Sequence, residues 1–210
     1  LEGCSGGGGR FDAGMLYYCP QIWCSDNTDA IERLRIQYGT SFGYPMSSVS
    51  AHVSVCPNHQ NHRVTPFKTR GICAMQGTFG YELDLSKMTD EEKKMAGEQI
   101  AFFKEHGRLF QFGDYYRLTS PFENRDYTVW EYAAQDGSEA CMSVVYTDMY
   151  ANAASEIVKR KGLDPKKVYQ MQLDGEDAGN FSGAALMHAG ILLPLPEQNY
   201  DAFQIYLKAE

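Results

Sequence analysis

The sequence lacks the features of membrane-spanning and nucleic-acid-binding proteins. Its 210 residues contain no apolar run near the ~20 residues that span a bilayer, since the stretch 190–195 is short and is interrupted by Pro194. A basic stripe is also missing: 19 Lys and Arg stand against 27 Asp and Glu, and the net charge is −8. We therefore expect neither a nucleic-acid partner nor a membrane anchor.

The six cysteines lack the spacing of a structural zinc site. The nearest pair, Cys19 and Cys24, is spaced C-x4-C, with no second pair and no H-x3-H partner. An even number allows a disulfide framework, but these cysteines are spread through a chain with 43% hydrophobic residues, unlike small disulfide-stabilised domains. Free thiols in a reducing cytoplasm are favoured, and no signal peptide is visible.

An initiator methionine is missing as well. The chain opens at Leu1 and runs from what resembles a strand end straight into four glycines, so we expect a fragment of a longer protein. The hydrophobic content and 13% aromatic residues are enough for one large domain or two small ones, and they exclude a disordered tail.

Residues 1–113 alternate short strands with helices. An apolar run at 21–24 predicts a strand, and N-cap residues then precede a helical stripe of Ile31, Leu34 and Tyr38. Alternation over 49–55 predicts the next strand. Such βα repetition is typical of a parallel sheet.

A second helix follows a T-x-x-E capping box formed by Thr89 and Glu92. Its C-cap is predicted at Gly107, and its buried stripe comprises Ala96, Ile100 and Phe103. A (β/α)8 barrel takes about 250 residues, so a segment of this length could hold only the last strands and helices of one.

Residues 114–210 favour a small antiparallel β-domain. Turn sequences separate aromatic or β-branched stretches at 115–119, 127–132, 140–146, 167–173 and 202–207. Residues 155–160 fit a helix or a strand, and the turn after them favours a hairpin.

Two segments are candidates for chemistry. The glycines at 6–9 fit neither a P-loop nor G-x-G-x-x-G; a linker is possible, but glycines at a strand end also allow a ligand close to the backbone. Trp23 and Asp26 follow a predicted parallel strand, where α/β proteins place their sites. An indole beside a carboxylate suits a sugar, whereas the plainer alternative makes Asp26 a helix N-cap and Trp23 a core residue.

Other polar residues favour structural roles. His59 and His62 are spaced H-x2-H in a polar loop, but loop structuring is favoured over metal binding. Asp12, Asp29 and Asp84 each fit a helix cap or a salt bridge.

Longer motifs resemble the α-galactosidases of glycoside hydrolase family 36. The segments that carry the resemblance are CSGGGGRFDAGM at 4–15, PQIWCSDNTDA at 20–30, RLRIQYGT at 33–40, PNHQ at 57–60 and FGYELDL at 79–85. The resemblance is strong to about residue 85 and weaker beyond it.

The resemblance implies an α/β plus all-β fold, with the C-terminal part of a (β/α)8 TIM barrel at 1–113 and a small antiparallel β-sandwich domain at 114–210. It implies that Asp26 is the general acid/base of retaining α-galactoside hydrolysis. Sugar contacts would come from Cys4, Gly6, Gly7 and Trp23. The family's nucleophile lies in a K-W-D motif that this sequence lacks, so we expect the isolated chain to be inactive.

The family needs no metal or organic cofactor, acts on galactose-containing oligosaccharides such as melibiose and raffinose, and often forms tetramers. Two alternatives stay open. One is a non-catalytic galactose-binding or structural fragment, and the other is a relative that transfers galactose to another sugar.

Overall fold

A computed structural model describes residues 1–4 and 6–210 of the chain. The chain divides into two compact units, Leu1–Gln111 and Phe112–Glu210. None of the helices among these described residues is long and apolar enough to cross a membrane.

The first unit alternates strands and helices, as the sequence predicts. Its strands are β1 (Glu2–Gly3), β2 (Gln21–Trp23), β3 (Val49–Ser50), β4 (Val53–Ser54) and β5 (Tyr81–Glu82). Its helices are α1 (Ala13–Tyr18), α2 (Ala30–Thr40), α3 (Phe67–Ala74), α4 (Asp90–Glu105) and α5 (Gly107–Phe112), with 3-10 turns at Met46–Ser48 and Leu85–Lys87.

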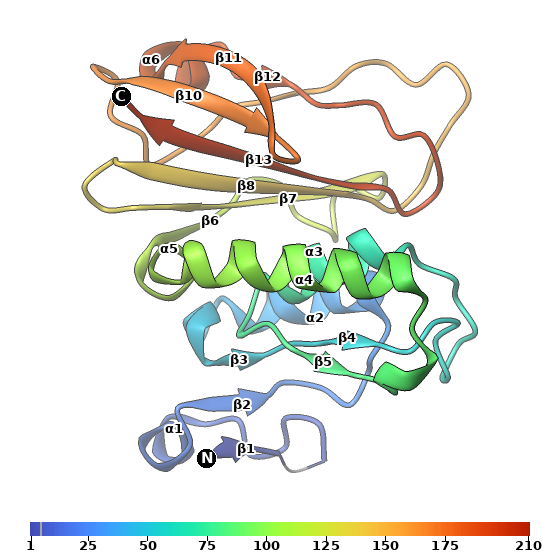
Figure 1. Ribbon diagram of the computed structural model, residues 1–210. Helices are drawn as coiled ribbons and strands as arrows, with labels where there is room; N and C mark the ends of the chain where they lie inside the picture. The colour runs from blue at the N-terminus through green and yellow to red at the C-terminus, as the bar shows by residue number, and fades with distance from the viewer. Residues whose placement is uncertain (5) are drawn as a thin grey trace. The chain divides into compact units, whose positions relative to one another are not determined.

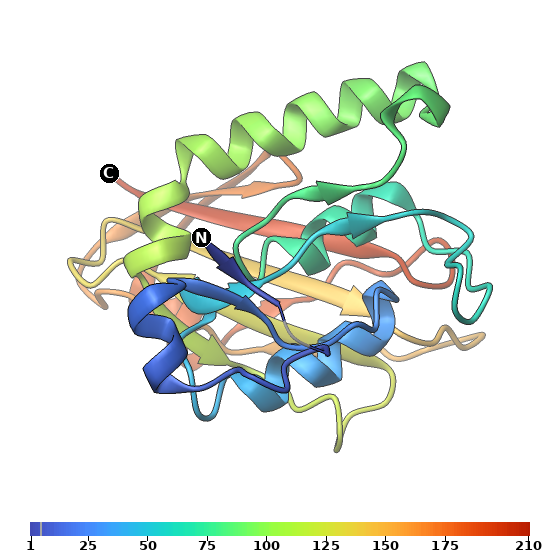
Figure 2. The same cartoon turned by 90° about the horizontal axis from the view of Figure 1, so that it is seen from below.

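All strand pairs of this unit are parallel, which confirms the expected βα repetition. β2 lies between β1 and β3, and β4 pairs with β5. The predicted strand over 49–55 is split, because Val49–Ser50 pairs with β2 whereas Val53–Ser54 pairs with β5. The arrows of β4 and β5 point the same way in Figures 1 and 2, so their carboxyl ends lie together.

Side-chain caps fix where the two main helices begin. Asp29 caps α2 by accepting from the Glu32 backbone N–H, and Thr89 and Glu92 form the predicted capping box of α4. The predicted C-cap at Gly107 is wrong: α4 ends at the cap residue His106, and Gly107 begins α5.

The predicted apolar stripe of α4 is right in part. Ala96 is buried, but Ile100 is 37% exposed, and the polar Gln99 is buried in its place. Gln99 accepts a hydrogen bond from the Tyr81 hydroxyl at 2.7 Å, which satisfies its amide oxygen inside the unit.

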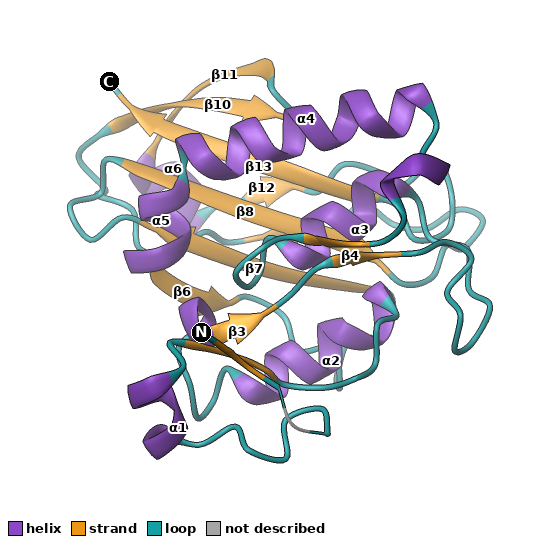
Figure 3. Cartoon of the chain, turned by 60° about the horizontal axis from the view of Figure 1, so that its bottom comes forward, coloured by secondary structure: helices purple, strands orange, loops and turns teal. Residues whose placement is uncertain are grey.

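The second unit is built on a six-stranded antiparallel sheet (Figure 3), which confirms the antiparallel prediction. The strand order is β11-β10-β13-β8-β7-β6. The bounds of these strands are Asp114–Arg117 (β6), Tyr127–Ala133 (β7), Glu139–Tyr146 (β8), Val168–Leu173 (β10), Glu176–Ser182 (β11) and Ala202–Ala209 (β13).

A smaller layer packs on one face of this sheet. It contains the two-stranded ribbon of β9 (Ile157–Val158) and β12 (Ile191–Leu192) and the helix α6 (Gly183–His188). The hairpin predicted after 155–160 is wrong, since β9 pairs with β12 and not with the strand that follows it. Val158, Leu186 and Ile191 join the sheet residues Val129 and Met142 in one hydrophobic core.

Candidate active site

A pocket lies beyond the carboxyl ends of the parallel strands. Its volume is about 290 Å³, and β1, β2, β4 and β5 or the segments that follow them all supply lining residues. The lining residues are Cys4, Trp23, Ser25, Asp26, Thr28, His52, Ser54, Val55, His59 and Glu82. We call it the first pocket.

The residues singled out from the sequence meet around Asp26. Cys4, Trp23 and Asp26 line the first pocket, while Gly6, Gly7 and Asp26 line a second pocket of about 530 Å³. Because Asp26 borders both, its exposed carboxylate can be reached from either side.

Asp26 is not a helix cap. The N-cap of α2 is Asp29, three residues later, and Asp12 and Asp84 cap other short helices. Among residues 1–4 and 6–210, the Asp26 carboxylate has no hydrogen-bond or ion-pair partner. An exposed, unpaired carboxylate at the mouth of a pocket is free to exchange a proton with a bound molecule.

The glycine segment packs closely against the segment after β2. A Cβ atom on Gly7 would lie 2.5 Å from the Asp26 nitrogen, and one on Gly8 would lie 2.5 Å from the Cys24 oxygen. Both residues also have positive φ angles, of 60° and 95°. These two glycines therefore let two loops of the same site touch, in addition to any access they give a ligand.

Trp23 contacts two residues that the sequence did not single out. The His52 ring meets it edge-on with 4.2 Å between ring centroids, and the Arg33 guanidinium carbon lies 5.4 Å from the centroid of its ring. Arg33 is 3% exposed and donates to the Ser50 oxygen at 2.8 Å. The spacing of apolar residues predicts this helix, but it gives no indication that a charged residue on it, Arg33, is buried.

His52 faces the first pocket with its side chain 8% exposed. Burial and the positive charge of Arg33 lower the pKa of His52 to about 4. The Glu82 carboxylate lies 2.7 Å from Nε2 and favours the charged form, but it is 71% exposed and screened by solvent. We therefore expect a neutral imidazole near pH 7.

The two histidines of the polar loop have different surroundings. His59 lines the first pocket, and His62 takes a left-handed conformation with φ 61°. No group of three or more His, Cys, Asp and Glu within the described residues could hold a metal ion. All six cysteines are free thiols.

Comparison with known proteins matches both parts of the chain. Residues 1–113 match the Melibiase family, and residues 127–207 match the glycosyl hydrolase family 36 C-terminal domain. The chain belongs to glycosyl hydrolase family 36. The resemblance that the motifs predict is thereby confirmed.

Relatives in this family are named α-galactosidases. The chain is 54% identical over 204 residues to the bifunctional alpha-galactosidase/sucrose kinase AgaSK of Mediterraneibacter gnavus, covering 97% of this chain and 21% of that protein. It is 50% identical over 209 residues to alpha-galactosidase AgaA of Geobacillus stearothermophilus, covering 100% of this chain and 28% of AgaA.

A crystal structure of an AgaA variant in complex with raffinose aligns with a TM-score of 0.94 at 49% identity, over 100% of this chain and 28% of that chain. This family member thus spans about a quarter of the length of the relatives it matches. The architecture of these family 36 domains, a parallel α/β part and an antiparallel sheet, is shared.

Proposed function

We propose that this chain is the C-terminal part of a longer retaining α-galactosidase. The exposed and unpaired Asp26 carboxylate, at the carboxyl end of β2 and beside Trp23, supports this proposal best. Residues 1–113 would form the last strands and helices of a catalytic (β/α)8 barrel, and residues 114–210 the C-terminal β-domain.

In this mechanism Asp26 is the general acid/base. It protonates the leaving oxygen of a terminal α-galactosyl bond and later removes a proton from the attacking water. A second carboxylate about 5 Å away forms the covalent galactosyl intermediate of a retaining enzyme. That nucleophile must come from outside this chain, because its two tryptophans, Trp23 and Trp130, do not lie in a K-W-D motif.

The same residues account for binding of the sugar. Trp23 offers an aromatic face for the C–H bonds of a galactose ring. Cys4, which lines the first pocket, and Gly6 and Gly7, which line the second, would contact its hydroxyls. Raffinose and melibiose are the proposed substrates, since the AgaA variant binds raffinose. No metal or organic cofactor takes part in this chemistry.

The test is Asp26→Asn in the full-length protein, with melibiose and raffinose as substrates. Loss of the acid/base is expected to lower kcat/KM about 10²–10⁴-fold while galactose binding, measured by calorimetry, stays within a few-fold. Asp90→Asn is the matched control, because the Asp90 side chain is 97% exposed on α4. Unchanged turnover in Asp26→Asn would contradict the assignment.

The absence of a K-W-D motif from this chain favours a second candidate, a fragment that binds galactose without hydrolysing it. The 210-residue chain alone is expected to show no turnover, and robust hydrolysis by it would overturn the proposed division of catalytic groups. Product analysis with an excess of acceptor sugar separates hydrolysis from galactosyl transfer.

We also propose a homotetramer in the cytoplasm. The six free thiols are consistent with a reducing compartment. Light scattering on the full-length protein would give the subunit number, and a monomeric mass would contradict the tetramer.

A further inference from the structure

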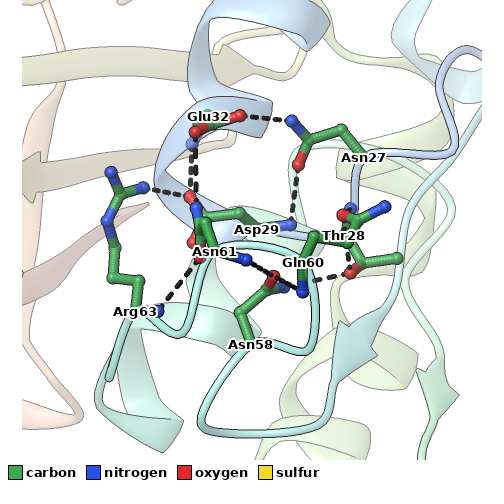
Figure 4. A network of polar contacts seen from close by, with 8 residues as sticks. All are labelled: Asn27, Thr28, Asp29, Glu32, Asn58, Gln60, Asn61 and Arg63. Atoms are coloured by element: carbon green, nitrogen blue, oxygen red, sulfur yellow. Dashed lines mark hydrogen bonds and ion pairs between the residues drawn. The ribbon is translucent and has the colours of Figure 1, made fainter.

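The loop after β4 reaches across to the segment that carries Asp26 (Figure 4). Gln60, in this loop, holds that segment at two points. Its Nε2 donates to the backbone oxygen of Asp26 at 3.0 Å, and its Oε1 accepts from the backbone N–H of Thr28 at 2.9 Å. One amide group thus binds the peptide on both sides of Asn27.

Gln60 is itself held in place. Its backbone N–H donates to the Asn58 side chain at 2.9 Å, and Asn58 donates to the Thr28 hydroxyl at 3.0 Å. Asn58 is 5% exposed, so this second connection lies in the interior of the unit. The two loops therefore form one closed hydrogen-bonded network, which restricts movement of each member.

The far end of the Asp26 segment is fixed by other contacts. Asp29 caps α2 and forms an ion pair with Arg63. Unlike the carboxylate of Asp29, the carboxylate of Asp26 has no partner among the described residues. The place of that carboxylate is consequently set through its backbone, and the contact nearest to it on that backbone is the one from Gln60.

We propose that Gln60 is a positioning residue for the acid/base: it holds the backbone of Asp26 so that the carboxylate meets the leaving oxygen. This inference rests on the proposed function. A displacement of about 1 Å at a catalytic group lowers the rate about 10²-fold, so loss of both hydrogen bonds is expected to be visible in kinetics.

The experiment is Gln60→Met in the full-length protein. Methionine keeps the length of the side chain and removes its hydrogen bonds to the backbone of Asp26 and Thr28, together with the one that Oε1 accepts from the Thr28 hydroxyl. Two substrates are compared: melibiose, whose sugar leaving group needs a proton, and an aryl α-galactoside whose acidic phenol leaves without one. We expect kcat/KM to fall about 10–100-fold on melibiose and at least fivefold less on the aryl galactoside, with KM within about threefold.

Gln198→Met is the control, because it makes the same change at an exposed glutamine of the second unit, far from Asp26 along the chain. It should leave both rates unchanged. Amide hydrogen exchange gives a second readout in the same proteins: the Thr28 N–H should exchange faster in Gln60→Met than in Gln198→Met, whether or not activity survives.

The outcomes separate the two proposals. An equal loss on both substrates, or no loss with unchanged exchange at Thr28, would overturn the role of Gln60 while the α-galactosidase assignment stands. If the unchanged protein hydrolyses neither substrate, the proposed function is overturned, and the positioning role falls with it.

Discussion

Gly7 lies directly against Asp26. A Cβ atom on Gly7 would come 2.5 Å from the backbone nitrogen of Asp26 and 3.0 Å from its Cγ. The backbone of Gly7 also has a φ of 60°, which side chains disfavour. The loop after β1 therefore limits where the backbone of Asp26 can lie from one side, while Gln60 holds it from another.

Gly7→Ala is expected to lower activity by displacing Asp26. The added methyl cannot be accommodated at 2.5 Å, so one of the two loops must move. In the full-length protein we expect kcat/KM on melibiose to fall at least about tenfold. Steady-state kinetics and thermal unfolding together would measure this.

Gly175→Ala separates the clash from backbone strain. Gly175 has a φ of 87°, but nothing lies within 4 Å of an added Cβ. Gly175→Ala therefore has the same cost of about 1 kcal/mol for a side chain in the left-handed conformation, but it has no contact with Asp26. Equal kinetics in Gly7→Ala and Gly175→Ala would show that the close contact has no effect on the site.

The stability of the first unit is expected to fall in mild acid because of His52. The pKa of His52 is about 4 in the folded protein, against about 6.5 when unfolded, so the unfolded chain binds more protons between these values. Stability is therefore full above pH ~6.5 and is lost as the pH falls toward ~4, by at most about 3 kcal/mol.

His52→Gln provides the comparison, because glutamine has no charge to gain in this range. In urea titrations, the free energy of unfolding of the unchanged protein should fall relative to that of His52→Gln as the pH is lowered from 7 to 4. NMR titration of the imidazole gives a direct check. An imidazole that becomes charged near pH 6.5 in the folded protein would contradict the expected burial effect.

The sequence predicts those features of the fold that depend on a few neighbouring residues. The Thr89–Glu92 capping box spans four residues and is found where expected. The split of Val49–Ser54 could not be predicted, because it depends on two different partner strands. Gln99 likewise is buried through a hydroxyl supplied by Tyr81, which no helical periodicity reveals.

The site follows the same rule. Trp23 and Asp26 could be placed at the site because α/β proteins place their sites at the carboxyl ends of parallel strands, whereas Cys4 comes only from the family resemblance. Gln60 acts on a backbone 34 positions earlier in the chain, and the position of its amide depends on a loop without regular structure. Its role is visible only in three dimensions.

In the second unit, Arg160 and Glu131 form an ion pair whose removal is expected to be strongly destabilising. Nε and Nη2 of Arg160 each lie 2.9 Å from Oε1 of Glu131, and both side chains are 0% exposed. Arg160→Met would leave a carboxylate buried without its partner, so we expect a loss of about 3–5 kcal/mol. Trp130, buried in the neighbouring position of β7, reports the unfolding by fluorescence.

Two further variants decide whether the pair itself is responsible. Lys166→Met, at an exposed cation of the same unit, should change the unfolding midpoint little. The double variant Glu131→Leu with Arg160→Met removes both charges and should be more stable than Arg160→Met alone, because no unpaired charge remains in the core. A double variant as unstable as the sum of its two single changes would mean that packing around Arg160, and not its charge, stabilises the unit.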